Sequence, residues 1–184
     1  MRPPIPGIIP GDYNIEFIGI IETKTVITLQ NGQPIPFKNI PGLLKSKLYK
    51  KMQADDKAME SLGRMPMSEA LEHFVFCLYG DVDNTPDVHA NGKLGETENF
   101  RCGEDCICLG WKSKDITING TALTPRQIQV ADKLASDMPD KQIAAELGMT
   151  VNTLITHKQN VYEKAGVMSR SGFVQQAFQN RVVR

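Results

Sequence analysis

The stretch that decides the fold is residues 123–166, LTPRQIQVADKLASDMPDKQIAAELGMTVNTLITHKQNVYEKAG. It opens with Thr124, Pro125 and Gln127, a pattern typical of a helix start. A threonine can cap the helix, proline suits its first position, and glutamine three residues after the cap can reach back to the cap's N–H group. Apolar residues then recur at helical spacing, which predicts a first helix that ends near Ser136.

Caps and glycines predict three further helices in the same region. We expect Asp140 to cap a short second helix and Gly148 to close it in a left-handed conformation, where a side chain would be strained. Thr150 is expected to cap a third helix that stops at Gly166, and a fourth helix begins near Ser169. Two short helices joined by a tight turn that contains glycine are typical of a helix-turn-helix motif.

The third predicted helix divides into two faces at 100° per residue. The apolar face, expected to pack against the first two helices, consists of Val151, Leu154, Val161 and Ala165. The opposite face carries Asn152, Thr156, Gln159, Asn160 and Glu163. Short amide and hydroxyl side chains are the groups that recognise base edges in DNA. A solvated face of a small helical bundle is the alternative, but the caps, the turn and the polar face together favour DNA binding.

This C-terminal region resembles the LuxR/GerE-type helix-turn-helix domain of bacterial transcription regulators over about a third of the chain. The resemblance implies a sequence-specific regulator that binds double-stranded DNA in the major groove through the helix from Val151 to Lys164. It further implies a homodimer and a contact with RNA polymerase. The positions that would read bases are Ile155, Thr156 and Gln159, and the DNA-binding set is completed by Asn152, Thr153, His157, Lys158, Asn160 and Lys164.

Two residues depart from the family pattern. Many members carry Lys or Arg where this chain has Ile155, so its affinity or base preference is expected to differ from the family norm. Many also carry an acidic residue where this chain has Gln127. The second difference is expected to affect only helix packing, because glutamine can still complete the capping box.

The charge distribution agrees with a DNA-binding C-terminal part. Residues 122–184 carry eight basic and five acidic side chains, whereas residues 1–121 carry thirteen and sixteen. The positive excess is small, so one domain alone should bind DNA weakly and a dimer would double the phosphate contacts. Phe173, Ala177 and Phe178 of the last helix could form the dimer surface, or could equally belong to the core of the domain.

Length and hydropathy favour two small domains in the cytoplasm. The chain has 184 residues, of which 41% are hydrophobic, enough for two modest cores. No apolar run approaches the length needed to span a membrane, and residues 1–12 are rich in proline rather than typical of a signal peptide. We therefore expect a cytoplasmic protein with no membrane contact.

The front region predicts a mixed α+β domain and matches no family that we recognise. Residues 15–29 are rich in β-branched side chains and suit a pair of strands, and Asn31-Gly32 is a hairpin-turn dipeptide. Residues 43–52 predict an amphipathic helix whose basic outer face is more simply a solvated face than a second DNA contact. A further helix is expected from Ser68 to about Tyr79, followed by an irregular loop over residues 81–101.

All four cysteines lie in this front region: Cys77, Cys102, Cys106 and Cys108. In a cytoplasmic chain, such clustering suggests a metal rather than disulfides. Tetrahedral Zn²⁺ bound by four thiolates is the usual structural site, so we predict one structural zinc here. The alternatives are unconnected thiols and an iron–sulfur cluster that senses redox state. His73 could replace one ligand, although a core position is the simpler interpretation.

The other motifs carry little chemistry. Asp81, Asp83, Asn84 and Asp87 lack the spacing, glycine and terminal glutamate of a helical calcium loop, so we interpret them as turn formers and caps. No phosphate-binding glycine loop, Gly-x-Ser-x-Gly elbow, His-Glu-x-x-His motif or zinc-deaminase pattern occurs, and the sequence therefore gives no support for an enzyme.

The sequence thus predicts an α+β protein with two domains. Residues 1–121 form a small mixed domain with a cysteine-bound zinc, and residues 122–184 form an all-α, four-helix DNA-binding domain. The expected function is sequence-specific transcription regulation. The alternatives are a protein–protein adaptor, and a redox- or metal-sensing regulator in which the cysteine cluster is the sensor.

Overall fold

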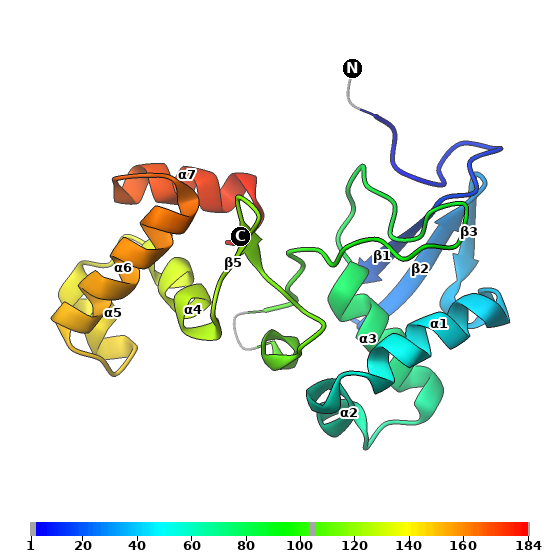
Figure 1. The fold of residues 1–184 in the computed structure, drawn as a ribbon, viewed down its shortest axis with the longest axis horizontal. Coiled ribbons are helices and arrows are strands. Elements are labelled where there is room, and N and C mark those ends of the chain that lie inside the picture. The colour runs from blue at the N-terminus through cyan, green and yellow to red at the C-terminus, as the bar shows by residue number, and fades with distance from the viewer. Residues whose placement is uncertain (1–2, 104–105, 184) are drawn as a thin grey trace. The chain divides into compact units, whose positions relative to one another are not determined.

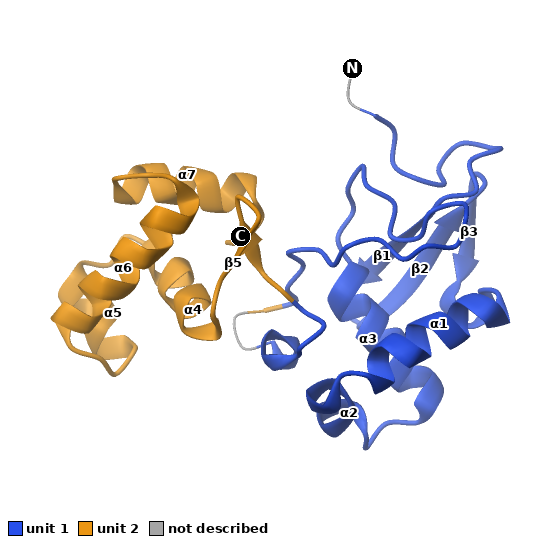
Figure 2. Ribbon diagram, viewed as in Figure 1, with its two compact units in different colours: residues 1–102, 106–114 blue, residues 103–105, 115–184 orange. Residues whose placement is uncertain are grey.

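The computed structural model describes residues 3–103 and 106–183. The fold is α+β and separates into two units, coloured in Figure 2. Unit 1 is Met1–Cys102 with Cys106–Lys114, and unit 2 is Gly103–Asp105 with Asp115–Arg184. In the described part of the chain, no helix combines the length and apolar character needed to cross a membrane.

Unit 1 begins with a three-stranded antiparallel sheet in the order β1-β2-β3. Its strands are β1 (Ile15–Ile20), β2 (Thr25–Gln30) and β3 (Gln33–Pro36). The predicted hairpin turn joins β2 to β3, and Asn31 and Gly32 both adopt positive φ, 53° and 74°. β3 was not predicted because its sequence, QPIP, contains two prolines. An edge strand tolerates proline because its outer N–H groups need no partner in the sheet.

Three helices complete unit 1 (Figure 1): α1 (Gly42–Gln53), α2 (Asp56–Leu62) and α3 (Met67–Tyr79). α1 and α3 confirm the two predicted helices. α2 was missed, although Asp55 caps it by accepting a hydrogen bond from the Ala58 N–H at 3.1 Å. α3 packs against β1 and β2 and against the other two helices, and most of its residues are buried.

Aromatic contacts attach the irregular end of unit 1 to α3. Trp111 follows a 3-10 turn, η2 (Ile107–Gly110), and stacks on Phe74 with 5.5 Å between ring centroids. Its indole Nε1 donates a hydrogen bond to Ser61 Oγ at 2.9 Å. Phe76 packs edge-on against Phe100 at 5.0 Å. The segment that carries three of the cysteines is therefore held against a buried helix.

The loop that carries Asp81, Asp83 and Asp87 is joined to β1 by hydrogen bonds to buried carboxylates. Glu16 accepts a hydrogen bond from the Asp83 N–H, and Asp87 accepts one from the Phe17 N–H, at 2.8 and 2.7 Å. Glu98 accepts one from the Asp81 N–H at 2.8 Å. Oxygen atoms of Glu16, Asp87 and Glu98 lie within 4.8 Å of one another. Burial and the neighbouring negative charges raise the pKa of Asp87 and raise the pKa of Glu98 to about 8.

Unit 2 contains a short hairpin and four helices. The hairpin pairs β4 (Thr117–Ile118) with β5 (Thr121–Ala122), and the helices are α4 (Pro125–Leu134), α5 (Asp140–Glu146), α6 (Val151–Ala165) and α7 (Arg170–Gln179). The sequence interpretation missed the hairpin and assigned residues up to 121 to the front domain. Asn119 nevertheless donates a side-chain hydrogen bond to the Ala165 carbonyl at 2.8 Å, which joins the hairpin to the helices.

Most of the predicted caps occur, with one correction. Thr124 and Gln127 form both hydrogen bonds of a capping box, Thr150 and Ser169 cap α6 and α7, and Gly148 has φ +61°. Asp140, however, is the first residue of α5 rather than its cap, which is Pro139. The Asp140 carboxylate instead accepts hydrogen bonds from Lys158.

Arg170 connects the start of α7 to the end of α4. Its guanidinium donates hydrogen bonds to the carbonyl oxygens of Leu134, Met138 and Ser136 at 2.9, 2.7 and 2.6 Å. The last carbonyls of a helix have no partner within the helix, so a cation at this place satisfies groups that would otherwise need water.

Replacing Arg170 with Ala should therefore destabilise unit 2 by about 2 kcal/mol, the order expected for hydrogen bonds to a charged group. The only tryptophan, Trp111, belongs to unit 1. Urea unfolding should then show an earlier loss of helical circular dichroism while the tryptophan fluorescence transition stays in place. Lys141→Ala, at an exposed position of α5, is the control. Equal shifts of both signals, or none, would contradict the assignment.

The acidic cluster predicts that unit 1 loses stability as the pH rises. With its folded pKa near 8 against an ordinary value of 4.5, Glu98 keeps its proton in the folded state after the unfolded chain has released it. Between these pH values the folded state binds more protons, so the free energy of unfolding falls with pH. Tryptophan fluorescence during urea unfolding at pH 5 to 8 should show this decline. Glu98→Gln should flatten it and the exposed Glu96→Gln should not; parallel profiles for all three proteins would refute the role of Glu98.

Candidate nucleic-acid interface and cysteine cluster

The caps and core of unit 2 fix the position of α6. Thr150 accepts a hydrogen bond from the Thr153 N–H at 3.1 Å, and Gly166 ends the helix with φ 66°. Leu154, Val161 and Ala165 are at most 2% exposed, and the helix packs against α4, α5 and α7. One side of α6 is thus buried along its length, and the opposite side faces outward.

The outward side of α6 matches most of the predicted polar face. Its exposed residues are Val151, Asn152, Thr153, Ile155, Thr156, Gln159, Asn160 and Glu163. Val151 was expected to pack in the core, but as the first residue of α6 it is 36% exposed. Ile155 is 41% exposed. The face therefore combines amide and hydroxyl groups with two branched apolar side chains.

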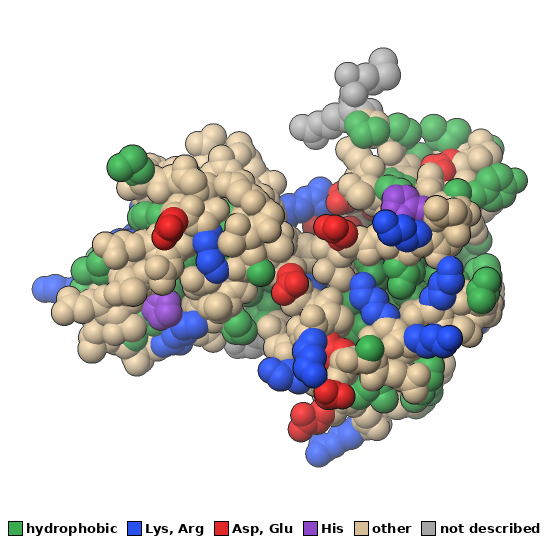
Figure 3. All heavy atoms as spheres, viewed as in Figure 1, with side chains coloured by type: hydrophobic (Ala, Val, Ile, Leu, Met, Phe, Trp, Pro, Cys, Tyr) green, Lys and Arg blue, Asp and Glu red, His purple; other side chains and the backbone are tan. Residues whose placement is uncertain are grey.

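The two lysines of the predicted site have partners inside unit 2. Lys158 Nζ lies 2.7 Å from Asp140, and its side chain is only 19% exposed. Lys164 Nζ donates hydrogen bonds to the Ala122 carbonyl at 2.6 Å and to Gln127 Oε1 at 2.9 Å. Either lysine would have to exchange a partner to contact a phosphate. The visible face of unit 2 is mostly uncharged, with separated basic side chains rather than one basic patch (Figure 3).

His157 lies at the border of this face. The residue is half-buried, and its Nδ1 atom is buried without a hydrogen-bond partner among the described residues. Its placement differs from that of the exposed Thr156 and Gln159, which lie fully on the outward side. The predicted set of nine residues therefore divides into an exposed group and three members, His157, Lys158 and Lys164, that are partly enclosed.

The last helix carries less exposed apolar surface than the sequence allowed. Phe173 and Ala177 are fully buried, and the Phe173 ring lies 5.6 Å from that of Tyr162 in the core of unit 2. The alternative that these two residues belong to the domain core is the one observed. Phe178 remains 50% exposed, and Met168, before the helix, is 99% exposed.

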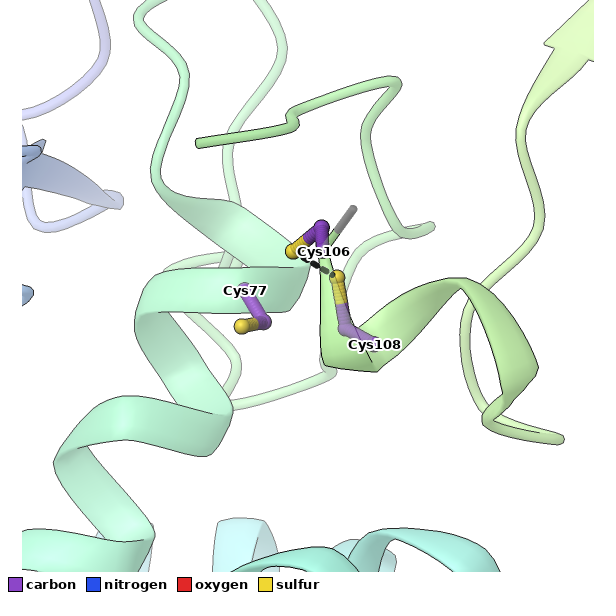
Figure 4. Close-up of side chains that lie close together, drawn as sticks. All are labelled: Cys77, Cys106 and Cys108. Carbon is purple, nitrogen blue, oxygen red and sulfur yellow. Dashed lines mark hydrogen bonds between the residues drawn. The ribbon is translucent and has the colours of Figure 1, made fainter. Parts of the chain in front are cut away.

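Three of the four cysteines, Cys77, Cys106 and Cys108, meet near the end of α3 (Figure 4). Cys77 lies in the last turns of α3, Cys106 precedes η2, and Cys108 lies within it. Their Sγ atoms are all within 4.8 Å of one another. The Sγ atoms of Cys106 and Cys108 are 2.8 Å apart, and those of Cys102 and Cys106 are 3.5 Å apart. All four are free thiols, and Cys77 and Cys108 are at most 1% exposed.

Hydrogen bonding makes Cys106 the most acidic thiol of this cluster. Hydrogen bonding with the Cys108 and Cys77 thiols favours the thiolate of Cys106 and lowers the pKa of Cys106. The same interactions raise the pKa of Cys77 and raise that of Cys108 to about 12. The cluster therefore gathers several sulfur atoms, which are the ligands that a soft cation binds once it displaces their protons.

Two other polar residues lie beside the cluster. The buried Lys114 Nζ donates hydrogen bonds to the carbonyls of Cys77 and Glu98 at 2.5 and 2.8 Å. His73 is 8% exposed and packs its ring edge against Phe76, with 6.0 Å between ring centroids. Neither His73 nor Cys102 belongs to the group of ligand atoms that all lie within 4.8 Å of one another, but Cys102 contacts Cys106 whereas the His73 ring packs against Phe76, so the core interpretation suits His73 better than ligation.

Comparison with known proteins agrees with the C-terminal geometry. Residues 121–177 match the family of bacterial regulatory proteins, luxR family. The transcriptional regulatory protein UhpA of Escherichia coli is 53% identical over 45 residues, which are 24% of this chain and 23% of that protein, and UhpA of Salmonella typhimurium gives the same values. The HTH-type transcriptional regulator MalT of Serratia proteamaculans is 42% identical over 62 residues, 34% of this chain and 7% of that protein.

The family match lies within unit 2. The chain spans less than a quarter of the length of each of these relatives. No solved structure matches the chain with statistical significance. Four capped helices, a glycine turn and an exposed polar face on α6 coincide with the matched residues. Residues 121–177 are therefore a LuxR-family domain, the helix-turn-helix domain of bacterial transcription regulators.

Proposed function

We propose that this chain is a sequence-specific transcriptional regulator that binds the major groove of double-stranded DNA through α6. The outward face of α6 carries this proposal. This face belongs to a capped helix whose opposite side packs against α4, α5 and α7, and it presents several short polar side chains. The major groove admits one α-helix, and its base edges offer the donors and acceptors that amides and hydroxyls recognise.

Two kinds of contact follow from the composition of this face. Thr156, Gln159 and Asn160 supply hydrogen bonds to base edges. Ile155 cannot form such bonds, but its exposed branched side chain suits the 5-methyl group of thymine, which lies in the major groove. A lysine or arginine at this place would favour guanine or phosphate instead. We therefore propose that Ile155 shifts the base preference of this domain toward thymine.

The weak positive charge of residues 122–184 supports binding as a homodimer. Lys158 and Lys164 are already engaged within the unit, so a single copy offers few free cations to the phosphate backbone. A second copy would double these contacts, and the exposed Phe178 and Met168 are the apolar side chains available near α7. RNA polymerase as a further partner is part of the same proposal and rests on the family resemblance alone.

Selection of binding sequences from random double-stranded DNA with the full chain tests the function. A defined motif should be enriched, with two half-sites about one helical turn apart if the chain binds as a dimer. Thr156→Ala and Gln159→Ala should each weaken binding to that motif by about 1–3 kcal/mol, because each removes a base contact. Gln175→Ala, exposed on α7, is the control. A lack of enrichment at any salt concentration would favour an adaptor that binds protein.

Replacement of thymine by deoxyuridine tests the role of Ile155. The two bases differ only in the 5-methyl group, whose burial is worth roughly 0.8 kcal/mol, or about fourfold in affinity. At one position of the enriched motif, the change from thymine to deoxyuridine should lower the affinity of the wild-type chain by about this factor. Ile155→Ala should bind both forms equally, whereas Gln175→Ala should keep the preference for thymine. If Ile155→Ala discriminates as well as the wild type, this residue does not read the methyl group.

A further inference from the structure

We propose that Cys77, Cys102, Cys106 and Cys108 bind one structural Zn²⁺ in unit 1. The site lies outside the residues that match the LuxR family. Its evidence is the meeting of Cys77, near the end of α3, with Cys106 and Cys108, which follow it by 29 and 31 residues, and the contact of Cys102 with Cys106.

The distances suit a single tetrahedral ion. Zinc–sulfur bonds of about 2.3 Å place the four sulfurs of a tetrahedral site roughly 3.8 Å apart. Here the Cys102–Cys106 separation is 3.5 Å, the Cys106–Cys108 separation is 2.8 Å, and Cys77 lies within 4.8 Å of both Cys106 and Cys108. Three of the four sulfurs are thus gathered as one ion requires, and the Cys102 sulfur, which contacts Cys106, would have to move toward Cys77 and Cys108 to complete the tetrahedron.

The surroundings favour a closed structural site over an open catalytic one. Cys77 and Cys108 are almost completely buried, so water reaches the centre poorly. Four thiolates fill all positions of a tetrahedral ion and leave none for a substrate. Neutralisation of thiolates by a divalent cation also removes the repulsion that several buried negative charges would otherwise create.

The polypeptide at Cys77 and Cys108 is already held in place. Cys77 belongs to the buried helix α3, and Cys108 is three residues before Trp111, whose ring stacks on Phe74. Lys114 bonds to the carbonyl of Cys77 itself. Little additional order is therefore needed to bind the ion. Its bonds to the cysteines would close the long loop between α3 and η2, which has little regular structure of its own.

Other uses of the thiols are less consistent with this geometry. An iron–sulfur cluster binds its cysteines through separate irons, which spreads the sulfurs farther apart than one ion does. A redox pair would need only Cys106 and Cys108, and would leave the approach of Cys77 and Cys102 without a role. A site with His73 would require that ring to leave its packing against Phe76.

Elemental analysis of the full chain, purified from cells without added metal, is the first test. We expect about one equivalent of zinc and no iron, with four thiols that react slowly until a chelator is added. Less than about half an equivalent of zinc, with four thiols freely titratable in the native protein, would overturn the proposal. So would stoichiometric iron, or a mass two hydrogens lower from a Cys106–Cys108 disulfide.

Cobalt and single variants test the ligand set. Co²⁺ added to the chelated protein should give the strong visible and near-ultraviolet absorption of tetrahedral thiolate coordination, and Zn²⁺ should displace it. Each of C77S, C102S, C106S and C108S should lower bound zinc below half an equivalent, whereas H73N should retain it. Loss of zinc in H73N, or full zinc in any serine variant, would refute the four-thiol site.

Wild-type protein provides a measurement that does not depend on the folding of variants. Chelation should lower the urea midpoint of the Trp111 fluorescence transition, and added Zn²⁺ should restore it, because the ion stabilises only the folded site. DNA binding by unit 2 should survive chelation, which separates this proposal from the one for DNA. An unchanged midpoint together with unchanged thiol reactivity would contradict a structural ion.

Discussion

The burial of α3 is the constraint on which unit 1 depends. This helix contacts the sheet and both neighbouring helices, and its aromatic residues form partners for Trp111 and Phe100. Because Trp111 directly follows η2, the position of α3 also sets the position of η2. The thiols meet at the end of α3 for the same reason. The packing of aromatic rings therefore positions the segments that carry the thiols.

Unit 2 is organised by local interactions to a greater degree. Its helices are short, and each begins or ends at a residue that satisfies backbone groups: a threonine or serine cap, a left-handed glycine, or the guanidinium of Arg170. The core is small but continuous, with Leu154 and Phe173 fully buried. These local interactions hold α6 with one of its sides facing outward.

The sequence predicted the parts of the fold that local chemistry determines. Capping residues and glycines gave the four helices of unit 2, and the Asn31-Gly32 turn gave a hairpin. The same dipeptide at Asn119-Gly120 could have predicted the β4–β5 hairpin, which was overlooked because its strands have only two residues each. β3 was hidden by its prolines. Short elements such as these gain their stability from neighbours that sequence periodicity does not describe.

Residues at the candidate sites divide in the same way. Periodicity placed Thr156 and Gln159 on the outer face of α6, but it could not tell that Lys158 meets Asp140 or that Val151 extends beyond the core, because both depend on the crossing of helices. Clustering of cysteines in the sequence predicted their proximity. It could not show that Cys102, rather than His73, lies beside Cys106, since that depends on how a loop without periodicity folds back on α3.

The two edges of the sheet have a consequence for how unit 1 can meet other molecules. On one side, β3 contributes Pro34 and Pro36, which lack N–H groups. On the other side, the backbone of β1 bonds to Val88 and Gly80. Extended peptides commonly join a protein by adding a strand to an open sheet edge, and such edges also drive aggregation. With one edge poor in donors and the other occupied, a partner of unit 1 has to recognise side chains rather than the backbone.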